Sequence, residues 1–151
     1  MKLTRPVVCS IVVAATVAAP AFAALGGDGT SVQADLVRMK GALRVTSNAA
    51  FTVHEITTSY GTVVREYVSA GDKVFAVSWR GPVIPDLRQM LGGYYGQFAQ
   101  AASAPHVGGH RHLAIEQPGL VVQSSGRMRA FFGRAWAPGL LPQNFSVSAI
   151  N

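Results

Sequence analysis

The chain has 151 residues and carries 13 lysines and arginines against 7 aspartates and glutamates, a formal charge of +6. This length suits one domain better than two. The single cysteine, Cys9, excludes an internal disulfide and a cysteine-rich zinc module. The sequence has no phosphate-binding loop and no dinucleotide-binding fingerprint, so we expect no cofactor.

Residues 1–23 have the three parts of a secretory signal peptide. Lys2 and Arg5 supply the positive start, Val7 to Ala19 is an apolar run, and Ala21-Phe22-Ala23 is the small-x-small pattern that signal peptidase cleaves. The apolar run is well short of the ~20 residues that span a membrane, so cleavage is preferred to an uncleaved anchor. We expect a mature chain that begins at Ala24, lacks a transmembrane segment and is periplasmic or secreted.

Removal of residues 1–23 also removes the cysteine, so the mature domain depends on its packed core for stability. Residues 24–30 are rich in glycine and are expected to form a flexible leader ahead of one domain, residues 31–151. Apolar residues at helical spacing predict a helix over 32–40, with Ser31 as its N-cap and Gly41 as its left-handed C-cap.

Alternating apolar residues predict a group of strands after this helix. The expected strands are Ala50–Thr58, Thr62–Ser69 and Lys73–Arg80, with Leu43–Thr46 as an additional edge strand. Phe75, Val77 and Trp79 alternate in the last of these, which predicts that they share the inward face. Short turns between neighbouring runs indicate an antiparallel meander.

Pro85 and Asp86 suit the first turn of a second helix, whose apolar stripe continues to Phe98. Gly92 and Gly93 interrupt this stripe, and two explanations stay open: close packing on the sheet, or a split of the helix. We expect returning strands at Leu113–Gln117, Leu120–Ser124 and Arg127–Trp136, with a turn at Ser125-Gly126.

This order of elements predicts an α+β fold. The expected antiparallel sheet has a three-stranded meander, a helix, and two to three returning strands, with the helices packed on one face.

Several segments spread over residues 24–151 form a recognisable set. They are Ala24-Leu-Gly-Gly-Asp, Gly61-Thr-Val-Val-Arg-Glu-Tyr-Val, Lys73-Val-Phe-Ala-Val-Ser-Trp, Pro85-Asp-Leu-Arg-Gln-Met-Leu-Gly-Gly-Tyr and Val121-Val-Gln-Ser-Ser-Gly-Arg-Met-Arg-Ala-Phe. Together they resemble a family of exported bacterial proteins catalogued as domain-of-unknown-function family 2844. The resemblance implies a single exported domain and assigns no catalytic or binding residue.

One candidate metal site is a loop rich in histidine. His110 and His112 are alternate residues, so an extended backbone places them on one face together with Glu116. Imidazole and carboxylate ligands would suit Zn, Cu or Ni, but the glycines around His106 leave the loop poorly preorganised. Soluble surface histidines are the preferred interpretation, and a metal-dependent enzyme is the alternative.

A serine nucleophile is weakly indicated, because Ser124-Ser125-Gly126 lacks the strained G-x-S-x-G elbow. The dipeptides His54-Glu55 and Arg65-Glu66 face each other across a predicted hairpin, which indicates cross-strand ion pairs rather than catalysis. Trp79 and Trp136 lie in apolar runs and are expected to fill the core.

Arg127 and Arg129 alternate in a predicted strand, with Arg134 further along, and this pattern suits an anionic polymer or surface. Solvated charge on a sheet is the plainer interpretation. We expect an exported envelope protein, non-catalytic, that has a binding or structural role. Its expected partner is an anionic envelope component or an envelope protein, and we expect no nucleic acid.

Overall fold

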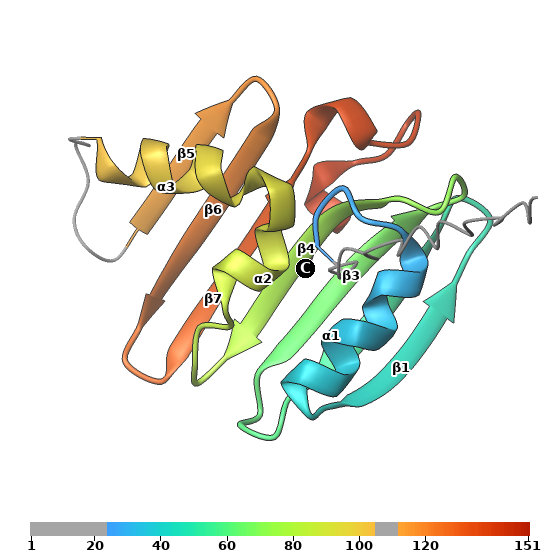
Figure 1. The fold of residues 1–151 in the computed structure, drawn as a ribbon, viewed down its shortest axis with the longest axis horizontal. Coiled ribbons are helices and arrows are strands. Elements are labelled where there is room, and N and C mark those ends of the chain that lie inside the picture. The colour runs from blue at the N-terminus through green and yellow to red at the C-terminus, as the bar shows by residue number, and fades with distance from the viewer. Residues whose placement is uncertain (1–23, 105–111) are drawn as a thin grey trace, which may run out of the picture.

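The computed structural model describes residues 24–104 and 112–151. Seven strands form one antiparallel sheet in the order β1-β2-β3-β4-β7-β6-β5 (Figure 1). The strands are β1 (Ala42–Ser47), β2 (Phe51–Thr57), β3 (Val63–Ser69), β4 (Val74–Gly81), β5 (His112–Gln117), β6 (Leu120–Arg127) and β7 (Ala130–Trp136). The helices are α1 (Val32–Met39), α2 (Leu87–Leu91) and α3 (Tyr95–Ser103), with short 3-10 turns η1 (Gly29–Ser31), η2 (Gly92–Tyr94), η3 (Pro138–Leu140) and η4 (Val147–Ala149). The predicted α+β class with an antiparallel sheet is confirmed.

The chain builds this sheet from two successive halves. In the first, α1 precedes the meander β1 to β4; in the second, α2 and α3 precede β5 to β7. The halves join where β4 and β7 pair, at the centre of the sheet. All three helices lie over the same face (Figure 1). Both edges of the sheet are therefore formed by strands that follow a helix, β1 and β5.

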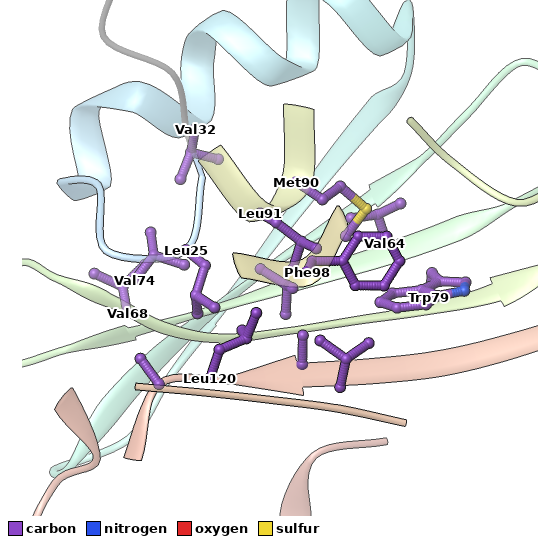
Figure 2. Packing of buried hydrophobic residues seen from close by; sticks show 14 of the residues in the cluster. Leu25, Val32, Val64, Val68, Val74, Trp79, Met90, Leu91, Phe98 and Leu120 are labelled. Carbon is purple, nitrogen blue, oxygen red and sulfur yellow. The ribbon is translucent and has the colours of Figure 1, made fainter. Parts of the chain in front are cut away.

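The main core lies between the helices and the sheet, as Figure 2 shows. Met90 and Phe98 from the helices pack beside Val64 and Trp79 of the sheet, and Val32 of α1 belongs to the same cluster. Burial of each such side chain contributes about 1.5–3 kcal/mol. Trp79 is 2 % exposed, so its predicted place in the core is correct.

A β-bulge changes which β4 residues face the helices. The β3–β4 register shifts between Tyr67 and Val68. As a result Val74, with Val77 and Trp79, belongs to the helix-side core, while Phe75 belongs to the core on the other face. The expectation that Phe75 shares the face of Val77 and Trp79 was wrong, because a strict two-residue alternation does not survive an extra residue in one strand.

The second core lies on the face opposite the helices, where the C-terminal segment crosses the sheet. Phe75 packs edge-on against Phe51 and Phe145, with ring centroids 6.1 and 4.8 Å away. Trp136, 9 % exposed, and Ile150, 2 % exposed, complete this cluster. The prediction that Trp136 is a core residue is confirmed.

Residues 24–30 differ from the flexible leader that we expected. Leu25 is 2 % exposed, and its backbone N–H donates to the Met90 carbonyl at 3.0 Å. The Gly26 N–H donates to the Val74 carbonyl, and the Val74 N–H donates to the Gly27 carbonyl. Glycine composition alone suggested mobility, but two backbone bonds to β4 make this segment part of the domain.

The second predicted helix is split at Gly92. The side chain of Asp86 caps α2 by accepting from the Arg88 N–H at 2.9 Å. The chain then takes a left-handed conformation at Gly92, with φ of +50°, and a Cβ at this position would clash with the Ala24 side chain. The glycine therefore serves both a turn and a close approach.

Candidate functional site

A row of side chains crosses four neighbouring strands, β4, β7, β6 and β5, near the C-terminal end of β4. Arg80 of β4 pairs with Phe132 of β7, Phe132 pairs with Ser125 of β6, and Ser125 pairs with His112 of β5. Directly paired residues point to the same face, and this row lies on the face opposite the helices. Ser125 Oγ and His112 Nδ1 are 2.7 Å apart, and the Arg80 guanidinium carbon is 5.9 Å from the Phe132 ring centroid.

The β6–β7 hairpin extends this row with two more arginines. The sequence predicted a turn at Ser125-Gly126 and one strand face for Arg127 and Arg129, and both expectations were wrong. Ser125 and Gly126 belong to β6, Arg127 ends that strand, and Arg129 lies in the turn with φ of +64°. The hairpin is at the bottom of Figure 1, beside the end of β4. Its arginines flank the exposed Met128.

Two adjoining hollows follow this row. One, of about 650 Å³, is lined by Arg80, Arg127 and Arg129; the other, of about 440 Å³, by Gln123 and Arg134. Arg80, His112, Ser125 and Phe132 line both hollows. We call the two together the basic trough: Arg80, His112, Gln123, Ser125, Arg127, Arg129, Phe132 and Arg134.

The charge of the basic trough is one-sided. Among residues 24–104 and 112–151, no aspartate or glutamate lines either hollow. The terminal Asn151 lines the 440 Å³ hollow, where its main-chain oxygen accepts from Arg65 and Ser78, and it does not line the 650 Å³ hollow. Within the same ranges, Arg80, Arg127 and Arg129 form no ion pair. Around the 650 Å³ hollow, guanidinium groups gathered without carboxylates create a positive potential that favours a negatively charged ligand.

Arg134, the third predicted arginine, binds groups of the protein itself. Arg134 Nε donates to Gln123 Oε1 at 2.9 Å, and Nη1 donates to the Val147 carbonyl at 3.1 Å. Arg134 thus lines the trough while it holds the C-terminal segment. On the same face, the ion pair between Arg65 and Glu55, at 2.7 Å, confirms the predicted cross-strand pairing.

The three candidate metal ligands are only partly placed by the structure. His112 and Glu116 are exposed on β5 and point to the same face of the strand, four residues apart. His106 and His110 lie outside the described residues. Within the part of the chain that the structure describes, no three His, Cys, Asp or Glu side chains are grouped as a metal site. The Ser125 hydroxyl, and no carboxylate, meets the Nδ1 atom of His112.

A buried acidic pair lies under α1, and sequence reasoning missed it. Asp35 of α1 and Glu66 of β3 are both 0 % exposed. The Gln89 amide donates to Asp35 Oδ1, and His54 is the cross-strand partner of Glu66. Asp35 and Glu66 share a hydrogen bond between their carboxyl groups. Apart from this bond, no donor or acceptor among the described residues reaches Asp35 Oδ2, His54 Nδ1 or either Glu66 carboxyl oxygen.

Burial controls the titration of this pair. It is the main cause that raises the pKa of Glu66 to about 9, and the charge of Asp35 adds to the rise. Burial also raises the pKa of Asp35 to about 6, although the hydrogen bond from Gln89 opposes the rise. Burial lowers the pKa of His54. Near neutral pH the two carboxyl groups therefore share one proton and carry one negative charge.

A signal for this pair does exist in the sequence. Asp35 lies on the helix face that Val32 and Leu36 make apolar, and Glu66 alternates with the apolar Val64. An acid at a position that the period assigns to the core marks a buried charge. Since both side chains are fully covered, the pair acts on the stability of the fold, and the surface chemistry belongs to the basic trough.

These features define a small α+β domain whose sheet carries an open basic trough on one face. The described residues include no helix that is long and apolar enough to cross a membrane. The chain belongs to a family described as a protein of unknown function, DUF2844, whose model matches residues 21–150. The resemblance noted from the sequence is thereby confirmed. No curated protein and no solved structure matches the chain.

Proposed function

We propose that this protein is an exported, non-catalytic binding protein of the bacterial cell envelope, and that it binds an anionic envelope component through the basic trough. One observation carries the proposal: Arg80, Arg127 and Arg129 come together from β4 and the β6–β7 hairpin around one hollow. No carboxylate of the described residues lines that hollow. A ligand with negative charge supplies the partners that the protein itself does not.

Export supports the choice of ligand. The signal-peptide features of residues 1–23 direct the chain to the periplasm or the outside, where the abundant polyanions are polysaccharides and lipid headgroups. Arginine suits such ligands because its planar guanidinium donates two parallel hydrogen bonds to a carboxylate or phosphate.

Binding of the purified mature chain to an acidic polysaccharide and to phosphatidylglycerol vesicles tests the proposal. We expect binding to at least one of them that weakens as NaCl rises from about 0.05 to 0.5 M, because exposed charges are screened over a few ångströms at high salt. The Arg127→Ala, Arg129→Ala double variant is expected to bind roughly tenfold more weakly, at up to about 1 kcal/mol for each exposed charge contact.

A charge-matched control separates the basic trough from net charge. Arg44 is exposed on β1 and Arg88 is exposed on α2, away from the trough. The Arg44→Ala, Arg88→Ala double variant loses the same charge and should keep its affinity. An equal loss in both double variants, or binding that salt does not affect, would refute the trough as the site.

A further inference from the structure

We infer that the anionic ligand of the basic trough is an acidic glycan, a chain of uronic acid residues, with one sugar ring seated over Phe132. This inference rests on the proposed function and names the chemical class of its ligand. It depends on the shape of the trough, its aromatic side chain and its uncharged polar groups.

The trough is elongated and of molecular size. The two hollows, about 650 and 440 Å³, share four lining residues and therefore adjoin. Each is within the ~300–1,000 Å³ of sites that hold small organic molecules, whereas a single phosphate or sulfate ion would occupy a small part of either. Their length suits a short stretch of a polymer that lies across the ends of four strands.

Phe132 supplies an apolar surface in the middle of the charged row. Its side chain is 49 % exposed on the face that carries the trough, between Arg80 and Ser125 in the cross-strand row. The C–H face of a sugar ring packs on such an aromatic ring, while its carboxylate reaches the neighbouring guanidinium groups. An anion without an apolar face gains nothing from Phe132.

Uncharged polar groups complete the match. Gln123 accepts from Arg134 through its carbonyl oxygen, and its side chain lines the 440 Å³ hollow. The Ser125 hydroxyl and the His112 Nδ1 atom share a hydrogen bond, and the His112 side chain is exposed. Amide, hydroxyl and imidazole groups both donate and accept, as sugar hydroxyls require, whereas lipid phosphates need donors alone.

The competing ligand class is an anionic bilayer, and Met128 is the feature that favours it. This side chain is 87 % exposed at the hairpin tip between two arginines. A bilayer anchor buries a broad apolar face, however, and within the β6–β7 turn only Met128 projects, since Phe132 lies further back on β7. Met128 and Phe132 therefore distinguish the two ligands.

The test is isothermal titration of the mature protein with a galacturonic acid hexamer, its methyl-esterified neutral form, polyphosphate, and phosphatidylglycerol vesicles. We expect the acidic hexamer to bind, and its neutral form to bind at least tenfold more weakly. Phe132→Ala should weaken hexamer binding about tenfold and leave polyphosphate binding unchanged. Met128→Gln should leave hexamer binding unchanged. Phe132→Leu keeps an apolar side chain but lacks the flat ring, and it should show the same loss of hexamer binding. This variant serves as the control for a folding defect in Phe132→Ala.

Two results overturn the inference in different ways. If polyphosphate or vesicles bind as tightly as the hexamer, and Phe132→Ala weakens none of them, the trough binds anions but does not recognise a sugar. Loss of vesicle binding in Met128→Gln would then identify the bilayer as the ligand. If no polyanion binds, both this inference and the proposed function fail.

Discussion

The buried acidic pair predicts an unusual dependence of stability on pH. Glu66 has a pKa raised to about 9 in the folded state and an ordinary value near 4.5 in the unfolded chain. When the pKa of a group is higher in the folded state than in the unfolded state, its protonation stabilises the fold. This stabilisation is complete at a pH below the unfolded-state pKa, and it is lost as the pH rises through the folded-state pKa. Between pH 7 and 8 the folded protein holds nearly one proton more, so its free energy of unfolding should fall by about 1.4 kcal/mol. At pH 9 half of that proton has been lost, so the slope is smaller and the whole fall from pH 7 to 9 is roughly 2 kcal/mol.

Glu66→Gln replaces the carboxyl group with a neutral amide of the same shape and should abolish this slope. The new amide N–H can donate to Asp35 in place of the protonated Glu66 carboxyl group, so the variant should fold. Urea denaturation at pH 7, 8 and 9, monitored by the fluorescence of the buried Trp79 and Trp136, measures the free energy of unfolding of the wild type and of Glu66→Gln.

Glu55→Gln is the matched control on the same hairpin. Glu55 pairs with the partly exposed Arg65 on the opposite face of the sheet, so its loss should cost up to about 1 kcal/mol and leave the slope intact. Wild-type stability that is constant from pH 7 to 9, or an unchanged slope in Glu66→Gln, would refute a protonated Glu66 in the core.

Three further outcomes are expected. Trp79→Ala should cost about 3–5 kcal/mol in urea denaturation, because the indole is 2 % exposed; a loss below ~1 kcal/mol would contradict its role in the core. Intact mass of the exported protein should correspond to a chain that begins at Ala24, and an uncut chain in an envelope fraction would restore the anchor interpretation. Elemental analysis of the untagged protein should find no stoichiometric metal, and one equivalent of zinc or copper that is lost in both His110→Ala and His112→Ala would establish the metal site instead.

Local patterns predicted most elements of this fold correctly. The helix expected over 32–40 is α1, and the runs around Val53, Val64 and Val77 are three neighbouring strands. These signals are reliable because helix and strand periods depend on residues a few positions apart. Two of the errors came where a distant segment decides the outcome: β4 binds the backbone of Gly26 and Gly27, and a bulge turns Phe75 to the other face.

The candidate site shows the same division. Sequence alone identified Arg127, Arg129 and Arg134 as basic residues near one another, but it misplaced the turn between them and did not connect them with Arg80 or Phe132. The row of Arg80, Phe132, Ser125 and His112 depends on the register of four strands, and register is set by long-range pairing and turns.

By itself, then, the sequence determined the α+β class, most of the strand and helix positions and the burial of both tryptophans, because each depends on local period and hydrophobicity. Only the tertiary structure decided which cations share a trough, that Arg134 is tied to the C-terminal segment, and that Asp35 meets Glu66. The physical reason is that charges separated by tens of residues become neighbours only after β4 pairs with β7 and α1 packs across β3.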